Sequence, residues 1–92
     1  MSRYILNVND KTVCRNDSYD KILDEFVRVS MRKSKQLKKK KNDGVDILGE
    51  VYDIRFIDTQ TGKLCLRNLI TGQNVMDKLD AYERMMMGRL RR

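Results

Sequence analysis

The residues best suited to do chemistry in this chain form a run of cations between Arg28 and Lys41. The run holds eight basic residues and no acidic one: Arg28, Arg32, Lys33, Lys35, Lys38, Lys39, Lys40 and Lys41. The chain has a formal net charge of +7, and outside this run it holds 12 basic and 13 acidic residues. Because the excess positive charge is concentrated in one segment, it predicts a polyanionic partner, and nucleic acid is the commonest one.

The chemistry expected of this run is contact with phosphate. Lysine is a flexible point charge that binds a nucleic-acid backbone without reading bases. Helical spacing sorts six of the cations into two strips, Arg28, Arg32, Lys35 and Lys39 in one and Lys33 and Lys40 in the other. The same run would also suit a solvated helix end, where cations favour the C-terminal dipole. Such a helix usually intersperses acids for pairing; none occurs from Phe26 to Asn42, which favours phosphate contact.

A second cationic group lies near the end of the chain. It consists of Arg84, Arg89, Arg91 and Arg92. Arginine donates two parallel hydrogen bonds to a phosphate, so this group adds to the predicted nucleic-acid site if it lies beside the lysine-rich helix. Otherwise it is a solvated chain end. The sequence leaves both readings open.

Three consecutive methionines precede these arginines. Methionine forms adaptable binding surfaces, and three successive helical residues cover most of a turn, so at least one must be exposed. Met86 fits the apolar stripe of the predicted last helix. Met85 and Met87 are therefore candidate contacts with a partner protein.

Catalysis has little support in the sequence. Histidine is absent, which removes the commonest general base and the commonest metal ligand. Asp53 and Asp58 are too far apart along one strand to act as a pair, and the two cysteines, Cys14 and Cys65, cannot complete a zinc site. No glycine-rich phosphate loop or nucleophile elbow is present. We expect a protein that is not an enzyme and that uses no metal or cofactor.

Aromatic residues on one predicted strand raise the question of base stacking. Tyr52 and Phe56 share a face with Ile54 between them. RNA-recognition sheets stack bases on such aromatics, but the RNP-type sequence motif of those sheets is missing here. We therefore interpret Tyr52 and Phe56 as core residues.

The elements that must position the cations follow from the apolar patterns. Arg3–Val8 alternates as a strand does, Asn9-Asp10 suits a tight turn, and Lys11–Arg15 forms a return strand. Residues 16–18 are all good helix N-caps. The helix is predicted to continue to about Lys40 and to end at residues 42–44, which accept a left-handed backbone conformation.

The second half of the chain repeats this order. Glu50–Asp58 and Lys63–Leu69 alternate as two strands around a turn that ends in Gly62, and Asn74 is the predicted cap of a last helix. The predicted fold is a single α+β domain over residues 1–92. It has a small antiparallel sheet with two helices, in the order ββαββα, or βαββα if residues 11–15 only extend the first strand.

The predicted core draws on one face of each element. The first helix contributes an apolar stripe of Tyr19, Ile22, Leu23, Phe26, Val27, Ser30 and Leu37, which is strong to about Val29 and fades afterwards. Leu64 and Leu66 are predicted to face the core from the return strand. The first half of the long helix should thus be packed and its second half largely solvated.

The chain resembles the small early proteins of T-even-like bacteriophages. The resemblance is one of character over the whole chain: short, rich in Lys and Asp, free of proline, with stretches such as SYDKILDEFVRVS and LDAYERMMMGRLRR. In charge and size it is similar to the small inhibitor that such phages use against a host endoribonuclease toxin. The resemblance implies neutralisation of a toxic ribonuclease with RNA as a co-ligand, and it carries over no site residue.

Two hypotheses follow for function. The first is a non-catalytic RNA-binding module, with RNA or DNA left open. The second is a protein-inhibitor or regulatory module that binds a host protein directly, without nucleic acid. An anionic membrane surface ranks last, because the basic segment lacks the Trp/Phe/Leu face of membrane-binding helices. The N-terminus lacks the apolar stretch of a signal peptide, so we expect a cytoplasmic protein, in the host cytoplasm if it is encoded by a phage. Its oligomeric state is not predicted.

Overall fold

The fold is a four-stranded sheet with a long helix along one face. A computed structural model describes residues 2–78 of the chain. Its elements are β1 (Tyr4–Val8), β2 (Lys11–Asn16), α1 (Tyr19–Asn42), β3 (Val51–Asp58), β4 (Lys63–Thr71) and a helical segment over residues 72–78. The order is ββαββα, which confirms the predicted α+β fold and the first of its two element orders.

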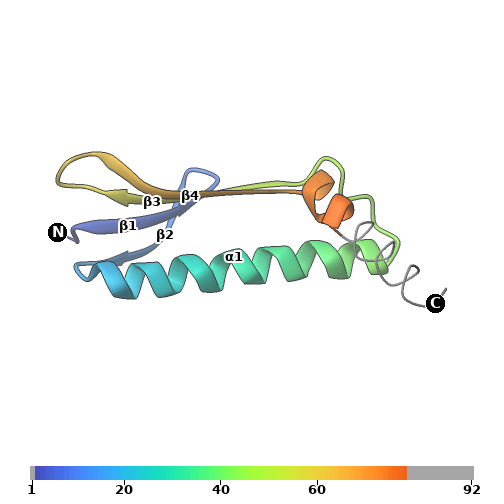
Figure 1. The fold of residues 1–92 in the computed structure, drawn as a ribbon, viewed down its shortest axis with the longest axis horizontal. Helices are drawn as coiled ribbons and strands as arrows, with labels where there is room; N and C mark the ends of the chain where they lie inside the picture. The colour runs from blue at the N-terminus through green and yellow to red at the C-terminus, as the bar shows by residue number, and fades with distance from the viewer. Residues whose placement is uncertain (1, 79–92) are drawn as a thin grey trace, which may run out of the picture.

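The sheet is antiparallel throughout, with the strand order β2-β1-β3-β4. α1 runs lengthwise beneath one face of the sheet (Figure 1). The first strand pair is thus inserted beside the second, with β1 against β3, and β2 and β4 form the two edges. Bringing β1 to β3 places residues from both halves of the chain over the same stretch of α1.

The turns and caps form where the local residues favour them. Asn9 and Asp10 adopt φ values of 50° and 68°, the left-handed conformation that a tight hairpin requires. Ser18 caps α1 by accepting a hydrogen bond from the backbone N–H of Lys21. Asp43 ends the helix, and Gly44 follows with φ 83°. The hairpin and both ends of the long helix agree with the prediction.

The core lies between α1 and the sheet and extends along α1 as far as Leu37. Phe56 and Ile54 of β3 are fully buried, and so are Ile22 and Leu37 of α1. Leu37 lies in the half of the helix that we predicted to be largely solvated. It belongs to the same buried cluster as Ile47, which follows the helix. Most other residues of this half are exposed, which agrees with the prediction that it is largely solvated, and Leu37 is the last member of the predicted apolar stripe.

The last helix begins earlier than predicted. Helical structure starts at residue 72, and the hydroxyl of Thr71 accepts a hydrogen bond from the backbone N–H of Asn74 at 3.0 Å. Thr71 is thus the cap, and Asn74 is already inside the helix. Gly72 is required at this junction, since a Cβ there would collide with the backbone carbonyl of Ile47.

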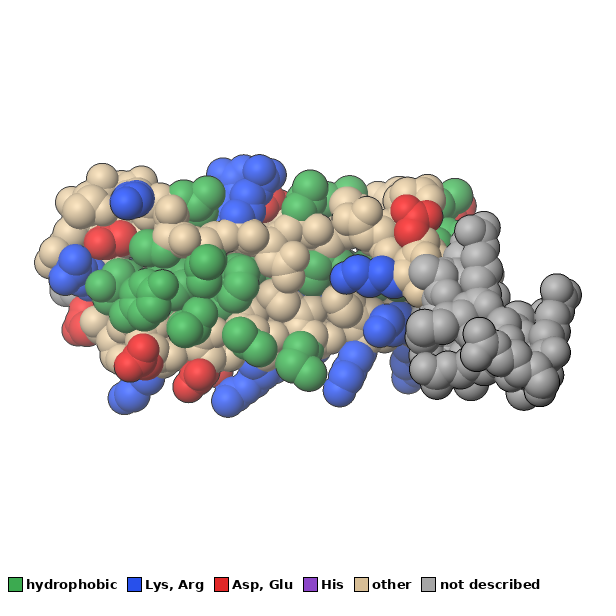
Figure 2. Space-filling view, viewed as in Figure 1, with side chains coloured by type: hydrophobic (Ala, Val, Ile, Leu, Met, Phe, Trp, Pro, Cys, Tyr) green, Lys and Arg blue, Asp and Glu red, His purple; other side chains and the backbone are tan. Residues whose placement is uncertain are grey.

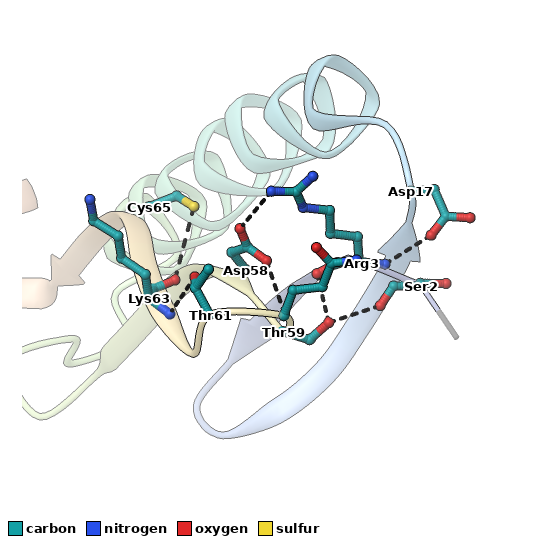
Figure 3. Close-up of polar contacts among 9 residues, drawn as sticks. Ser2, Arg3, Asp17, Asp58, Thr59, Thr61, Lys63 and Cys65 are labelled. Atoms are coloured by element: carbon teal, nitrogen blue, oxygen red, sulfur yellow. Dashed lines mark hydrogen bonds and ion pairs between the residues drawn. The ribbon is translucent and has the colours of Figure 1, made fainter.

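The start of the chain is tied to the turn between β3 and β4 (Figure 3). The Arg3 guanidinium donates to the Asp58 carboxylate at 3.3 Å, and the Thr59 hydroxyl donates to the backbone carbonyl of Arg3 at 2.7 Å. The Arg3 backbone N–H donates in turn to Asp17 at 2.9 Å. These contacts fix the end of the sheet at which α1 begins.

Several residues predicted for the core are partly exposed. Tyr19, Val27, Leu64 and Leu66 each leave more than a third of their surface uncovered. A bulge contributes to this on β4: Leu66 pairs with the buried Phe56, whereas Leu64 pairs with Ile57. Since alternate strand residues face opposite ways, Leu64 lies on the face turned away from α1. The prediction that Leu64 faces the core was wrong for this reason.

Candidate nucleic-acid interface

Four cations form a strip on the outer side of α1. They are Arg28, Arg32, Lys35 and Lys39, which we call the outer basic strip, and all four are exposed. They recur at spacings of three and four residues on the side of the helix opposite its buried residues. Figure 2 shows basic side chains projecting along the edge of the molecule that α1 forms. Arg28 and Arg32 also border β2, where each lines a hollow with residues of that strand, and Lys35 lines a hollow on the β4 side.

The acidic residues of α1 are confined to its first half. The first two turns contain Asp20, Asp24 and Glu25, whereas the last turn is basic and contains no acidic residue. Glu25 accepts a hydrogen bond from Arg28 at 2.8 Å. Within residues 2–78, no ion pair involves the other three cations of the strip. From Arg32 onward the strip therefore offers charge that the described part of the protein does not neutralise.

The second predicted strip contacts the body of the protein instead. The Lys33 ammonium lies 4.9 Å from the centre of the Tyr52 ring, a cation–π geometry. Lys40 forms an ion pair with Glu50 at 3.2 Å. Both cations thus hold α1 against the strand β3 and the segment before it. Of the two basic strips predicted on this helix, only the outer basic strip remains a candidate for phosphate contact.

The aromatics of β3 have structural roles. Phe56 is fully buried and packs against the ring of Tyr19, with ring centres 4.9 Å apart. Tyr52 is half-buried beneath Lys33. Their interpretation as core residues is confirmed.

Lys38 and Lys41 do not join the outer basic strip. Lys38 points toward the β4 side of α1, where it borders a hollow of about 110 Å³ together with Asn68, Asn74 and Lys78. Lys41 is half-buried. The apolar residues Leu69, Ile70 and Val75 also line this hollow.

The C-terminal candidates lie outside the described residues. These are the arginines Arg84, Arg89, Arg91 and Arg92 and the methionines Met85 and Met87. Their roles in phosphate and partner contact stay predictions.

A charge network that the sequence analysis missed lies on the open face of the sheet. Asp53 accepts two hydrogen bonds from Arg67, at 3.0 and 3.1 Å, and one from Arg55 at 3.1 Å. These bonds, first from Arg67 and then from Arg55, lower the pKa of Asp53 from 3.8 to about 2. The Asp53 carboxylate and several N–H groups of Arg55 and Arg67 are therefore occupied by one another. It leaves the open face less basic than its sequence suggests.

Asp58 is likewise committed to structure. Burial would raise the pKa of this carboxyl, but hydrogen bonds from the Arg3 guanidinium and the backbone N–H of Gln60 outweigh it and leave the pKa below its usual value. Across residues 2–78, no three His, Cys, Asp or Glu side chains gather as metal ligands would, and Cys14 and Cys65 are free thiols. No helix in this part of the chain is long and apolar enough to span a membrane.

Comparison with known proteins finds no relative. No protein-family model matches the chain, and neither curated proteins nor solved structures contain a match. The main feature of the described residues that bears on function is the outer basic strip, mounted on the sheet by the buried residues of α1.

Proposed function

We propose that this protein binds nucleic acid without catalysis, through phosphate contacts made by the outer basic strip of α1. The proposal rests on the strip itself, which has four exposed cations at helical spacing, in a helix with no acidic residue after Glu25. Such a row can follow a phosphate backbone at many sequences, because lysine and arginine contacts to phosphate carry no base information.

The mounting of α1 supports this role. Buried residues Ile22, Val29 and Leu37 fix the helix to the sheet along most of its length. Lys33 and Lys40 add contacts on its inner flank. A cation held on a fixed element loses less conformational entropy on binding than one on a loose tail. The strip is in this sense preorganised for a polyanion.

A narrower form of the proposal rests on the phage resemblance. It makes the protein a cytoplasmic counter-defence factor that neutralises a host endoribonuclease toxin, with RNA as a co-ligand. The choice of RNA over DNA comes from this resemblance alone, because phosphate contacts do not read the 2′-hydroxyl.

The test is binding of a short mixed-sequence RNA, followed by fluorescence anisotropy. The variant Arg32→Gln, Lys35→Gln, Lys39→Gln removes three charges from the strip. Each phosphate contact to a single strand contributes about 0.7 to the slope of log K against log salt, so the loss of three contacts lowers the slope by about 2. If the proteins bind equally at about 1 M salt, the variant should bind about 100-fold more weakly than the wild type at about 0.1 M salt.

The matched control removes the same charge elsewhere. Arg15→Gln, Lys63→Gln, Lys78→Gln takes three exposed cations from β2, β4 and the last helical segment. This control should retain most of the affinity. Equal losses in the two variants would mean that net charge, and not the strip, binds RNA. The same titration with single-stranded DNA decides between the two nucleic acids.

A second candidate function is direct binding of a protein. One observation favours it, the partly exposed apolar side chains between α1 and β4.

A further inference from the structure

An apolar surface runs along α1 on the side of the edge strand β4. It consists of Tyr19, Leu23, Val27 and Met31 of α1 and Leu66 of β4, and we call it the β4-edge surface. Leu23 is half-buried, while Tyr19, Val27, Met31 and Leu66 are 42%, 50%, 55% and 37% exposed. In Figure 2, which views this side, hydrophobic side chains form a continuous area between the sheet and α1. A contiguous apolar area of this kind is typical of a binding site.

The backbone of β4 borders this surface. β4 is nine residues long and stands at the end of the strand order, so within the described sheet only β3 pairs with it. An antiparallel edge strand directs alternate N–H and C=O groups outward, and an added strand can bind them. Side chains of such a strand that point toward α1 would meet Leu66, Val27 and Met31.

The far end of the β4-edge surface is cationic. Beyond Val27 it continues into a hollow of about 300 Å³ lined by Met31, Asn68, Lys35 and Lys38. The hydroxyl oxygen of Ser30, another lining residue, is buried and has no hydrogen-bond partner among residues 2–78. The surface thus changes along its length from apolar to positively charged and polar.

We infer that the β4-edge surface binds an extended, acidic segment of a partner protein, which adds to the sheet as a strand beside β4. Its apolar side chains lie on Val27 and Leu66, and its acidic end lies at Lys38. The cations Lys35 and Lys38 at one end of the surface favour an acidic occupant. A second copy of this chain is the competing occupant, and sedimentation velocity tests for it.

The probe is a panel of three nine-residue peptides in which valine and threonine alternate. One peptide ends in a pair of glutamates, one ends in a pair of lysines, and one carries no charged side chain. Binding to the full chain is followed by amide hydrogen exchange and by chemical-shift changes. We expect the glutamate peptide to bind most tightly and to protect amides of β4. A version with N-methyl groups on alternate amides should not bind, since it cannot pair with the strand.

Two exposed valines provide a matched comparison. Val27→Glu should weaken binding of the glutamate peptide about ten-fold or more, which corresponds to about 1.4 kcal/mol per ten-fold step. Val13→Glu, at a valine of 52% exposure on the other edge strand, should leave it unchanged. Lys38→Glu should reverse the preference between glutamate and lysine peptides. Lys38 lies outside the outer basic strip, so this result is independent of nucleic-acid binding through that strip.

The inference is overturned if no peptide protects β4, or if charge at the peptide end makes no difference. It is also overturned if the protein alone dimerises and Val27→Glu abolishes the dimer in sedimentation velocity, because the occupant is then a second copy. Protection of β4 by mixed-sequence RNA in place of the peptides would equally contradict it.

Discussion

Asp53 links charge to strand pairing on the open face of the sheet. Arg55 and Arg67 stand directly opposite each other on β3 and β4, and the Asp53 carboxylate binds both. Like charges facing each other across strands are destabilising, so the carboxylate offsets their repulsion. Alternation along β3 predicts which face Asp53 takes. Its partner Arg67 depends on the register of β4, which is set by the bulge beside Phe56 and has no signature in the sequence.

The stability of this network should depend on pH. Because the pKa of Asp53 is lowered on folding from 3.8 to about 2, its contribution is fully present above about pH 4 and is lost as the pH falls toward 2. We expect a double-mutant cycle of Asp53→Asn and Arg67→Gln, measured by urea unfolding, to show favourable coupling near neutral pH and almost none near pH 2. Coupling that persists unchanged at low pH would mean that the two side chains interact without the carboxylate charge.

At the scale of elements, some features of α1 can be predicted from the sequence and others cannot. Its N-cap, its end and its cationic face follow from local residue types. The roles of Lys33 and Lys40 do not, because their partners Tyr52 and Glu50 are ten or more residues away in sequence. The apolar stripe predicts that Leu37 is buried, but not that Ile47, which follows the helix, belongs to the same buried cluster.

Leu37 tests how firmly the cationic half of α1 is held. Leu37→Ala should lower the free energy of unfolding by about 2–5 kcal/mol, the usual cost of a cavity at a fully buried leucine. Met31→Ala, at an exposed position on the same helix, should change it by less than about 0.5 kcal/mol. Both are measured by urea unfolding followed by circular dichroism. Equal effects would show that the second half of α1 is not packed as described.

At the scale of the whole molecule, two surfaces meet along α1. The outer basic strip follows the exposed side of the helix, the β4-edge surface lies on its flank beside an edge strand, and Lys35 borders both. Fold class and charge segregation can be predicted from composition and periodicity. The apolar flank cannot, because Tyr19, Val27 and Leu66 have the spacing of core residues and differ from them only in what the tertiary structure leaves uncovered.

The salt dependence of RNA binding is the most direct test of phosphate binding by the outer basic strip. We measure log K against log salt concentration for three proteins: the wild type, the variant Arg32→Gln, Lys35→Gln, Lys39→Gln, and the control Arg15→Gln, Lys63→Gln, Lys78→Gln. We expect a slope that is shallower by about 2 for the strip variant, because three phosphate contacts are lost at about 0.7 each, and a wild-type slope for the control. Three equal slopes, or a control that loses as much as the strip variant, would contradict phosphate binding by the outer basic strip.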